Sequence, residues 1–214
     1  MYKLIILLII SNLTFAQKKQ TLDLADLFKK GKIVAINREM KSVTENGRNF
    51  IQLADNKEEG LVWLPTKGFK NGKITVKMRG KDVLQRSFVG IAFHGSNDTT
   101  YDAVYCRPFN FFAKDSVRKI HAIQYISHPI FTWKKLREER NGVFEKEIIN
   151  SPNPNDWFTM TLIIDKKSVK AFINQDVKPS LVIEKLNVRE NGKLGLFVGD
   201  NAGGDFETII KESK

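Results

Sequence analysis

The side chains best suited to chemistry lie between Ser87 and Asn110, in the segment SFVGIAFHGSNDTTYDAVYCRPFN. Two runs of alternating residues flank a polar turn there, so the segment predicts a β-hairpin. One face of this hairpin combines small residues with side chains that stack or form directed hydrogen bonds: Gly90, Ala92, His94, Tyr101, Ala103, Tyr105 and Arg107. Aromatic rings beside a planar guanidinium suit a flat, polar ligand. The small residues predict either a shallow floor for that ligand or room for a covering sheet or loop.

Three residues farther along the chain extend this candidate site. Asn110 follows Pro108, which ends the second strand. Gln124 lies in the strand predicted over 121–127, and Trp133 begins the segment WKKLREER, which predicts one helical turn or an extended loop. Trp133 could stack on a ligand or anchor that loop. The predicted ligand-binding residues are His94, Tyr101, Tyr105, Arg107, Asn110, Gln124 and Trp133, with Arg107 expected outside the hydrophobic core.

Paired carboxylates do not accompany these residues. Retaining glucanases use two carboxyl groups about 5 Å apart on one face of a strand. Glu138 and Glu139 are adjacent, so on a strand they would point in opposite directions. Glu145 and Glu147 are two residues apart and would share one face of a strand. The third acid that completes the pattern in glucanases of this type is missing beside them. Glucanase chemistry of this type is therefore not expected.

Other acid and base groups leave catalysis open. His94, His121 or Tyr105 could act as acid or base in a hydrolase or lyase, with Arg107 holding an anionic intermediate. Whether the chain is an enzyme stays undecided at this point.

Metal ligands are sparse in the sequence. The three histidines lack a same-face carboxylate, which argues against zinc. Asp200 and Asp205 bracket the turn GDNAGGD and are the only candidates for calcium. Turn chemistry alone also explains that segment, so we expect no cofactor, with calcium as the alternative.

The N-terminal segment 1–16, MYKLIILLIISNLTFA, has a basic residue, a short apolar run and a small-residue end. This pattern predicts a signal peptide cleaved near Ala16, and hence an exported chain with no membrane span after removal. Residues 17–214 are then one domain. Loss of Lys3 changes the formal charge of the chain from +11 to 11 − 1 = +10.

The positive charge is scattered along the chain, and no nucleic-acid-binding motif accompanies it, so we expect no nucleic-acid partner. A basic surface would also attract acidic polysaccharide. Cys106 is the only cysteine, which excludes an internal disulfide. The pattern predicts no particular oligomeric state.

Short alternating runs punctuated by Gly, Asn and Pro predict an all-β, antiparallel two-sheet sandwich. One short N-terminal helix is expected over 21–31, with Thr21 as its N-cap and Gly31 as its end. The expected strands cover residues 33–37, 49–53, 60–63, 73–79, 88–94, 101–107, 121–127, 157–164, 168–173, 181–184, 193–199 and 205–211.

The run WFTMTLIIDKKSVKAFIN, then PSLVIEKL, then GKLGLFVGDNAGGDFETIIK resembles the closing strands of the concanavalin A-like lectin/glucanase jelly roll. That superfamily includes laminin-G-like domains and the 3-keto-disaccharide hydrolase domains of secreted bacterial proteins. FVGIAFHG and YDAVYCRPFNF resemble its central strands. The resemblance implies two stacked sheets with any sugar on the concave one, and it places His94, Tyr105, Arg107, Asn110 and Gln124 in that groove.

The hypothesis from sequence is an exported β-sandwich that binds carbohydrate or polysaccharide without catalysis. A sugar-active hydrolase in the same groove is the alternative. A structural or protein-interaction module is the third reading, because the superfamily includes all three classes.

Overall fold

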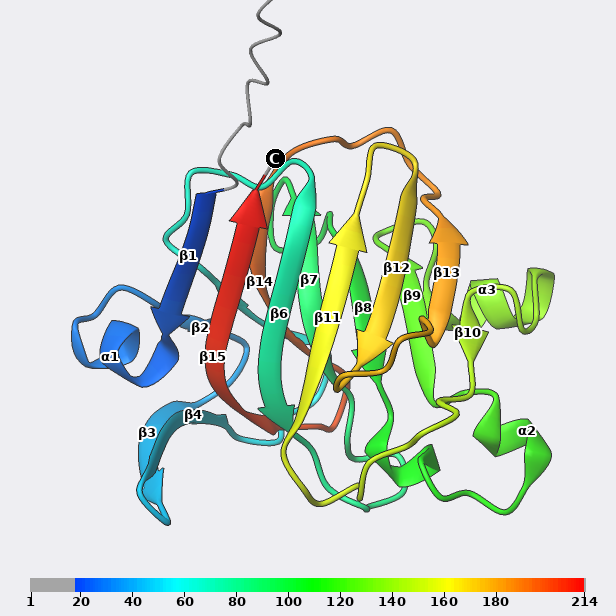
Figure 1. Ribbon diagram of the computed structural model, residues 1–214, viewed down its shortest axis with the longest axis horizontal. Coiled ribbons are helices and arrows are strands. Elements are labelled where there is room, and N and C mark those ends of the chain that lie inside the picture. Colours follow the sequence, from blue (N-terminus) through cyan, green and yellow to red (C-terminus); the bar gives the residue numbers. More distant parts are fainter. Residues whose placement is uncertain (1–17, 214) are drawn as a thin grey trace, which may run out of the picture.

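The computed structural model describes residues 18–213, and the predicted signal peptide therefore lies outside the described residues. Two antiparallel sheets pack face to face, as the sequence predicts (Figure 1). The first sheet has the order β13-β12-β11-β6-β15-β4-β3, and β1 also pairs with β15. Its strands are β1 (Lys18–Asp23), β3 (Met40–Glu45), β4 (Arg48–Leu53), β6 (Gly72–Arg79), β11 (Phe158–Ile164), β12 (Ser168–Ile173), β13 (Leu181–Glu184) and β15 (Gly204–Ser213).

The second sheet has the order β10-β9-β8-β7-β14-β5-β2. Its strands are β2 (Ala35–Ile36), β5 (Gly60–Trp63), β7 (Val89–Gly95), β8 (Asp102–Cys106), β9 (Ile123–Ser127), β10 (Glu145–Lys146) and β14 (Lys193–Val198). The predicted hairpin is β7 and β8, in which Ile91 pairs with Val104. Strands β1, β3 and β10 were not predicted from the sequence.

The two sheets bury their side chains differently. On β6, Ile74, Val76 and Met78 are fully buried, while the residues between them are partly exposed, which is the alternation of a sheet with one wet face. Every residue of β7, β8 and β9 is buried. Both faces of the second sheet are therefore covered along these central strands.

The small residues of β7 make room for a neighbouring aromatic side chain. A Cβ at Gly90 would lie 2.2 Å from the carbonyl oxygen of Val104 and 2.6 Å from Cβ of Tyr105. The outer face of the hairpin is therefore filled by the Tyr105 side chain at this point. Of the two interpretations of the small residues, room for a covering group fits the structure, and an open surface for a flat ligand does not.

His94 does not share the outer face with Tyr105, and the prediction that it lies in the groove is wrong in this respect. Its φ of 49° breaks the alternation of β7. The imidazole is fully buried, with ring centroids 5.1 Å from Phe93 and 6.1 Å from Phe69. Its Nε2 donates to the carbonyl of Lys70 at 2.7 Å.

Helix α1 (Leu24–Lys29) begins later than expected, because Thr21 belongs to β1 and Asp23 caps the helix by accepting from the Asp26 amide. Gly31 follows its end with φ 62°. Three further short helices are present: η1 (Pro108–Asn110), α2 (Ser116–Lys119) and α3 (Trp133–Glu139). The first two were not predicted, whereas α3 covers the segment in which a helical turn or a loop was expected. In Figure 1, α2 and α3 lie beside β10, at one edge of the sandwich. Within residues 18–213 no helix is both long and apolar enough to cross a membrane.

Burial lowers the pKa of His94 below its ordinary value of 6.5. The unfolded chain then binds more protons than the folded chain as pH falls below about 6.5, so we predict that the free energy of unfolding decreases toward acid pH. His94→Asn tolerates the positive φ and should reduce this slope, measured by urea denaturation at about pH 5 and about pH 7.5. An unchanged slope in the variant would contradict the assignment to His94.

Candidate functional site

A cavity of ≈ 480 Å³ opens on the face of the second sheet that points away from the first. Its volume lies in the range of small-molecule sites. Residues from β8, β14, α2, α3 and the intervening loops line it: Glu59, Leu84, Gln85, Phe88, Tyr105, Arg107, Phe109, Asn110, Arg118, His121, Trp133, Arg137, Phe197, Gly199, Asp200 and Asn201.

Aromatic rings form one apolar part of the lining. The ring centroids of Tyr105 and Phe197, on β8 and β14, are 5.1 Å apart. The Phe88 ring packs edge-on against Tyr105 and Phe109, with centroid distances of 6.1 Å and 5.4 Å. Tyr105 and Phe197 are only 3% and 1% exposed. Phe88 is partly exposed, so it offers most of the ring surface of this group to the cavity, whose other walls carry polar groups.

Arg107 connects the aromatic rings to a polar network. Its Nη2 donates to the Tyr105 hydroxyl at 2.8 Å and to Oε1 of Gln124, and its Nη1 donates to the His121 carbonyl at 2.9 Å. The guanidinium also lies 5.0 Å from the centroid of the Tyr105 ring. Arg107 is only 4% exposed, so the expectation that it lies outside the core is wrong.

Glu145 on β10 is the carboxylate at the centre of the network, and it is 2% exposed. Arg137 donates to both of its oxygens, from Nε at 3.1 Å and from Nη2 at 2.8 Å. Nδ1 of His121 lies 2.8 Å from Oε2 and Nη1 of Arg107 lies 3.7 Å from it. One buried carboxylate thus serves three potentially cationic groups.

The protonation states follow from this burial. Burial lowers the pKa of His121, against the opposing effect of the nearby Glu145 carboxylate. Burial raises the pKa of Tyr105 to about 12, although Arg107 acts in the opposite direction. At neutral pH Tyr105 is therefore a hydroxyl donor, and the lowered pKa favours the uncharged form of His121.

Arg118 stands at the mouth of the cavity, where its side chain is held by the η1 turn. Its Nη2 donates to the Phe109 carbonyl at 2.8 Å and its Nε donates to Oδ1 of Asn110 at 3.2 Å. Asn110 in turn donates to the His121 carbonyl at 3.3 Å. Arg118 and Asn110 thereby link α2 and η1, both in the β8–β9 connection, to the His121 carbonyl, which also accepts from Arg107.

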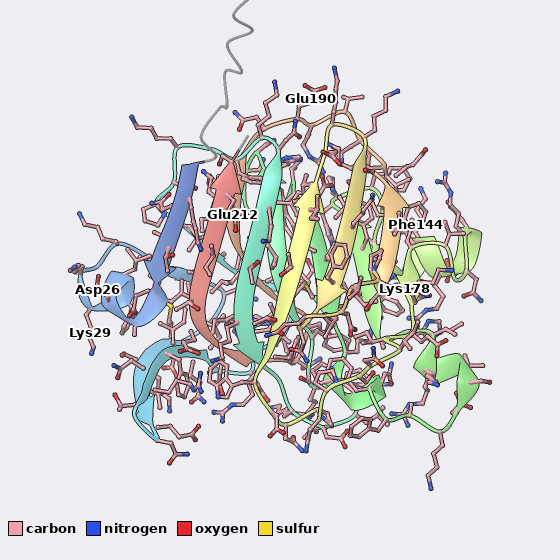
Figure 2. The ribbon with its side chains drawn as sticks, in the orientation of Figure 1. Asp26, Lys29, Phe144, Lys178, Glu190 and Glu212 are labelled. Atoms are coloured by element: carbon pink, nitrogen blue, oxygen red, sulfur yellow. The ribbon has the colours of Figure 1, made fainter. Side chains whose placement is uncertain are left out.

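Helix α3 supplies the wall next to Glu145. Leu136 is buried, while Trp133 remains 44% exposed and the Arg137 guanidinium lies 5.2 Å from its ring centroid. Gln124 donates to the Trp133 carbonyl at 3.5 Å. Phe144, labelled in Figure 2 on the side of the molecule that carries α3, lies 6.0 Å from the Tyr125 ring. Residues 133–139 form helix α3, so the helical interpretation of WKKLREER is confirmed. Trp133 keeps exposed surface that a ligand could contact.

The opposite wall carries two carboxylates. Glu59 accepts from the Tyr101 hydroxyl at 2.5 Å, and Nε2 of His128 lies 3.2 Å from its other oxygen. Asp200 accepts from the Glu58 amide at 2.6 Å and from Asn201 at 2.9 Å. The cavity is therefore basic on the α2–α3 side and acidic on the β5–β14 side.

A buried arginine holds the two loops of the acidic wall together. Arg38 donates to the carbonyls of Glu58 at 2.6 Å, Gly199 at 2.8 Å and Ala202 at 2.9 Å. It also donates to the Asn37 carbonyl at 2.5 Å. Glu59 directly follows Glu58, and Asp200 directly follows Gly199. Arg38 therefore fixes the backbone next to both carboxylates.

The structure brings together most of the predicted site residues. Tyr105, Arg107, Asn110 and Trp133 line the cavity, and Gln124 is bonded to three of them, Tyr105, Arg107 and Trp133. Tyr101 does not line it but contacts it through Glu59, and His94 is buried elsewhere. That any of these residues binds a ligand stays a prediction.

Sequence reasoning missed the importance of Glu145, Arg137 and Phe197. Glu145 had been noted only for its spacing with Glu147, and its partners come from other segments, so nothing local indicated them. Phe197 could have been found from the alternation of β14, which places it opposite Gly90 on the outer face.

The two calcium candidates have separate partners. Asp205 lies 2.7 Å from Nη2 of Arg79 and accepts from Gln52 at 2.9 Å, whereas Asp200 belongs to the acidic wall. Among residues 18–213, no group of three or more His, Cys, Asp or Glu side chains is placed to hold a metal ion. Calcium binding at this turn stays a prediction without geometric support.

Neither the known protein-family models nor the curated proteins contain a match to this chain. Solved structures do resemble it. The carbohydrate-binding module CBM66 from Bacillus subtilis has a TM-score of 0.55 at 12% identity and covers 85% of this chain and 92% of its own. The lumenal domain of VIP36 bound to Ca²⁺ and Man3GlcNAc has a TM-score of 0.55 at 9% identity and covers 91% and 88%.

A third similar structure is a GH16 enzyme of Bacteroides ovatus, from a mixed-linkage glucan utilisation locus, in complex with a G4G4G3G product. Its TM-score is 0.54 at 10% identity, covering 90% of this chain and 99% of that one. At such identities the likeness defines the fold alone, and it confirms the two-sheet jelly-roll sandwich predicted from the sequence.

Removing the Glu145 charge should destabilise the protein. We predict that Glu145→Gln lowers the free energy of unfolding by about 3 kcal/mol, because it leaves Arg107 buried without its nearby carboxylate. Glu147→Gln is the matched control, since Glu147 is 46% exposed and 3.2 Å from Lys119, and it should cost less than about 1 kcal/mol. Equal effects in urea denaturation would show that Glu145 is not the centre of the network.

Arg38→Met should also destabilise the fold, by about 3 kcal/mol, because five backbone carbonyls lose a charged donor. Hydrogen exchange of the amides around Glu58 and Ala202 should increase more than exchange in β11. Arg86→Met, at an exposed arginine in the β6–β7 connection, should leave both measurements near wild type. Unchanged exchange at the two loops would contradict the anchoring role.

Proposed function

We propose that this chain binds carbohydrate in the cavity on the outer face of the second sheet. The observation that carries the proposal is the combination, in ≈ 480 Å³, of flat aromatic rings with a fixed network of hydrogen-bonding groups. Sugars have apolar faces that stack on rings and hydroxyls that need directed donors and acceptors. Phe88 and Trp133, which keep exposed surface in the cavity, supply the first requirement. Arg118 and Glu59 supply the second, backed by the buried network around Arg107.

The fold supports this proposal, since the similar structures include a carbohydrate-binding module, a lectin domain bound to an oligosaccharide and a glucanase with its product. We further propose that the chain is exported, on the basis of its N-terminal pattern. Its cavity, lined by aromatic rings and polar groups, favours a glycan over the flat apolar face expected of a laminin-G-like protein-interaction module.

A sugar-active hydrolase is the second candidate, and one observation favours it. His121 lines the cavity with Nδ1 2.8 Å from the Glu145 carboxylate, an arrangement that would orient the imidazole as a general base. Tyr105, protonated and bonded to Arg107, could donate a proton. Binding without turnover remains the first proposal because Arg107 and Arg137 already occupy the Glu145 carboxylate.

A glycan array and a soluble oligosaccharide panel test the proposal. We expect Trp133→Ala to weaken binding by up to about tenfold through the loss of a stacking surface. Phe112→Ala removes an aromatic side chain that is 63% exposed and does not line the cavity, so it should leave affinity unchanged. Binding to no glycan in the panel would refute carbohydrate binding.

Mass spectrometry of the same incubations separates the two candidates. Unaltered oligosaccharides support a binding module. New reducing ends that disappear in His121→Asn, while binding is retained, would establish the hydrolase instead.

A further inference from the structure

The cavity has an excess of positive charge on one wall. Arg107, Arg118 and Arg137 all line this wall, and His121 lies among them. Glu145 is the carboxylate that contacts Arg107 and Arg137, and it is shared between them. Arg107 and Arg137 therefore share a single carboxylate as counter-ion, which leaves one net positive charge, and Arg118 adds another.

Arg118 is the group of this wall with capacity for a ligand. Within the described part of the chain, no carboxylate lies within ion-pair distance of its guanidinium, whose printed partners are the neutral Phe109 carbonyl and the Asn110 amide oxygen. These two bonds use Nη2 and Nε and orient the planar group. Nη1 has no partner among residues 18–213. An arginine fixed by neutral acceptors keeps its full charge for an anion, which it binds through directed donors.

The acidic wall does not cancel this charge locally. Glu59 is bonded to Tyr101 and lies 3.2 Å from His128, and Asp200 is bonded to the Glu58 amide and Asn201. Both come from the β5–β14 side, whereas Arg118 belongs to the β8–β9 connection. Carboxylates so placed can accept hydrogen bonds from sugar hydroxyls, while an anionic substituent would face the arginines.

We propose that the ligand is an acidic glycan, with the carboxylate of a uronic acid residue bound at Arg118 on the basic wall and its neutral sugar ring over the aromatic rings. This inference rests on the proposed carbohydrate binding and names its substrate class. A planar carboxylate matches the two parallel donors that a guanidinium offers. The net positive charge of the chain, +11, favours the approach of such polyanions.

The test uses oligomers of galacturonate, glucuronate, mannuronate and guluronate, each paired with its carboxyl-reduced counterpart, in calorimetry at low and raised salt. We expect at least one uronate oligomer to bind about tenfold more tightly than its reduced form. Arg118→Gln should abolish this difference. Lys170→Gln, which removes the same charge from an exposed position on β12 of the first sheet, should preserve it.

The outcomes separate this inference from the broader proposal. Reduced oligomers that bind as tightly as the uronates would overturn the acidic ligand and leave carbohydrate binding intact. A preference for uronates that persists in Arg118→Gln would overturn the assigned site. Sulfated neutral oligomers that bind as well as uronates would overturn the carboxylate in favour of charge alone, and no binding to any oligomer would overturn both proposals.

Discussion

The arrangement around the cavity depends on one buried carboxylate. Glu145 sits on a two-residue strand at the edge of the second sheet, where it pairs with Gln124. Such a short strand contributes little on its own, yet the Glu145 side chain contacts Arg137 of α3 and Arg107, which lies between β8 and η1. Because an unpaired charge in the interior is costly, each of these elements is held where its partner requires it. The positions of Arg107 and Arg137 in the basic wall are thus tied to Glu145, whereas Arg118 is held by the η1 turn.

The two sheets differ in how their outer faces are covered. The first sheet has the simple alternation seen on β6, with an apolar inner face and a wet outer face. The second sheet carries the cavity, and its central strands are covered on both faces. The cavity walls come from the connections that leave this sheet, which carry η1, α2 and α3. Variation in those connections would change the shape and charge of the cavity without disturbing the core.

The sequence was sufficient to predict the sandwich and most of its strands, because the alternation of apolar residues is local. It also located the Tyr105–Arg107 segment of the site, since ring and guanidinium types can be recognised without a structure. Two features could not be predicted. The burial of Arg107 depends on Glu145, which lies 38 residues later in the chain. No local pattern around Arg107 indicates that partner. The position of His94 depends on a left-handed backbone residue, which the side-chain pattern does not encode.

Arg38 gives the opposite wall a different character. Its guanidinium is bonded to backbone carbonyls of Asn37, Glu58, Gly199 and Ala202, and every amino acid offers that acceptor. Side-chain identity at Asn37, Glu58 and Ala202 is therefore not needed for this anchor, whereas the basic wall requires a carboxylate at Glu145. The two sides of the cavity consequently differ in mutational tolerance: the acidic side can drift in sequence while keeping its shape, and the basic side must change as a set.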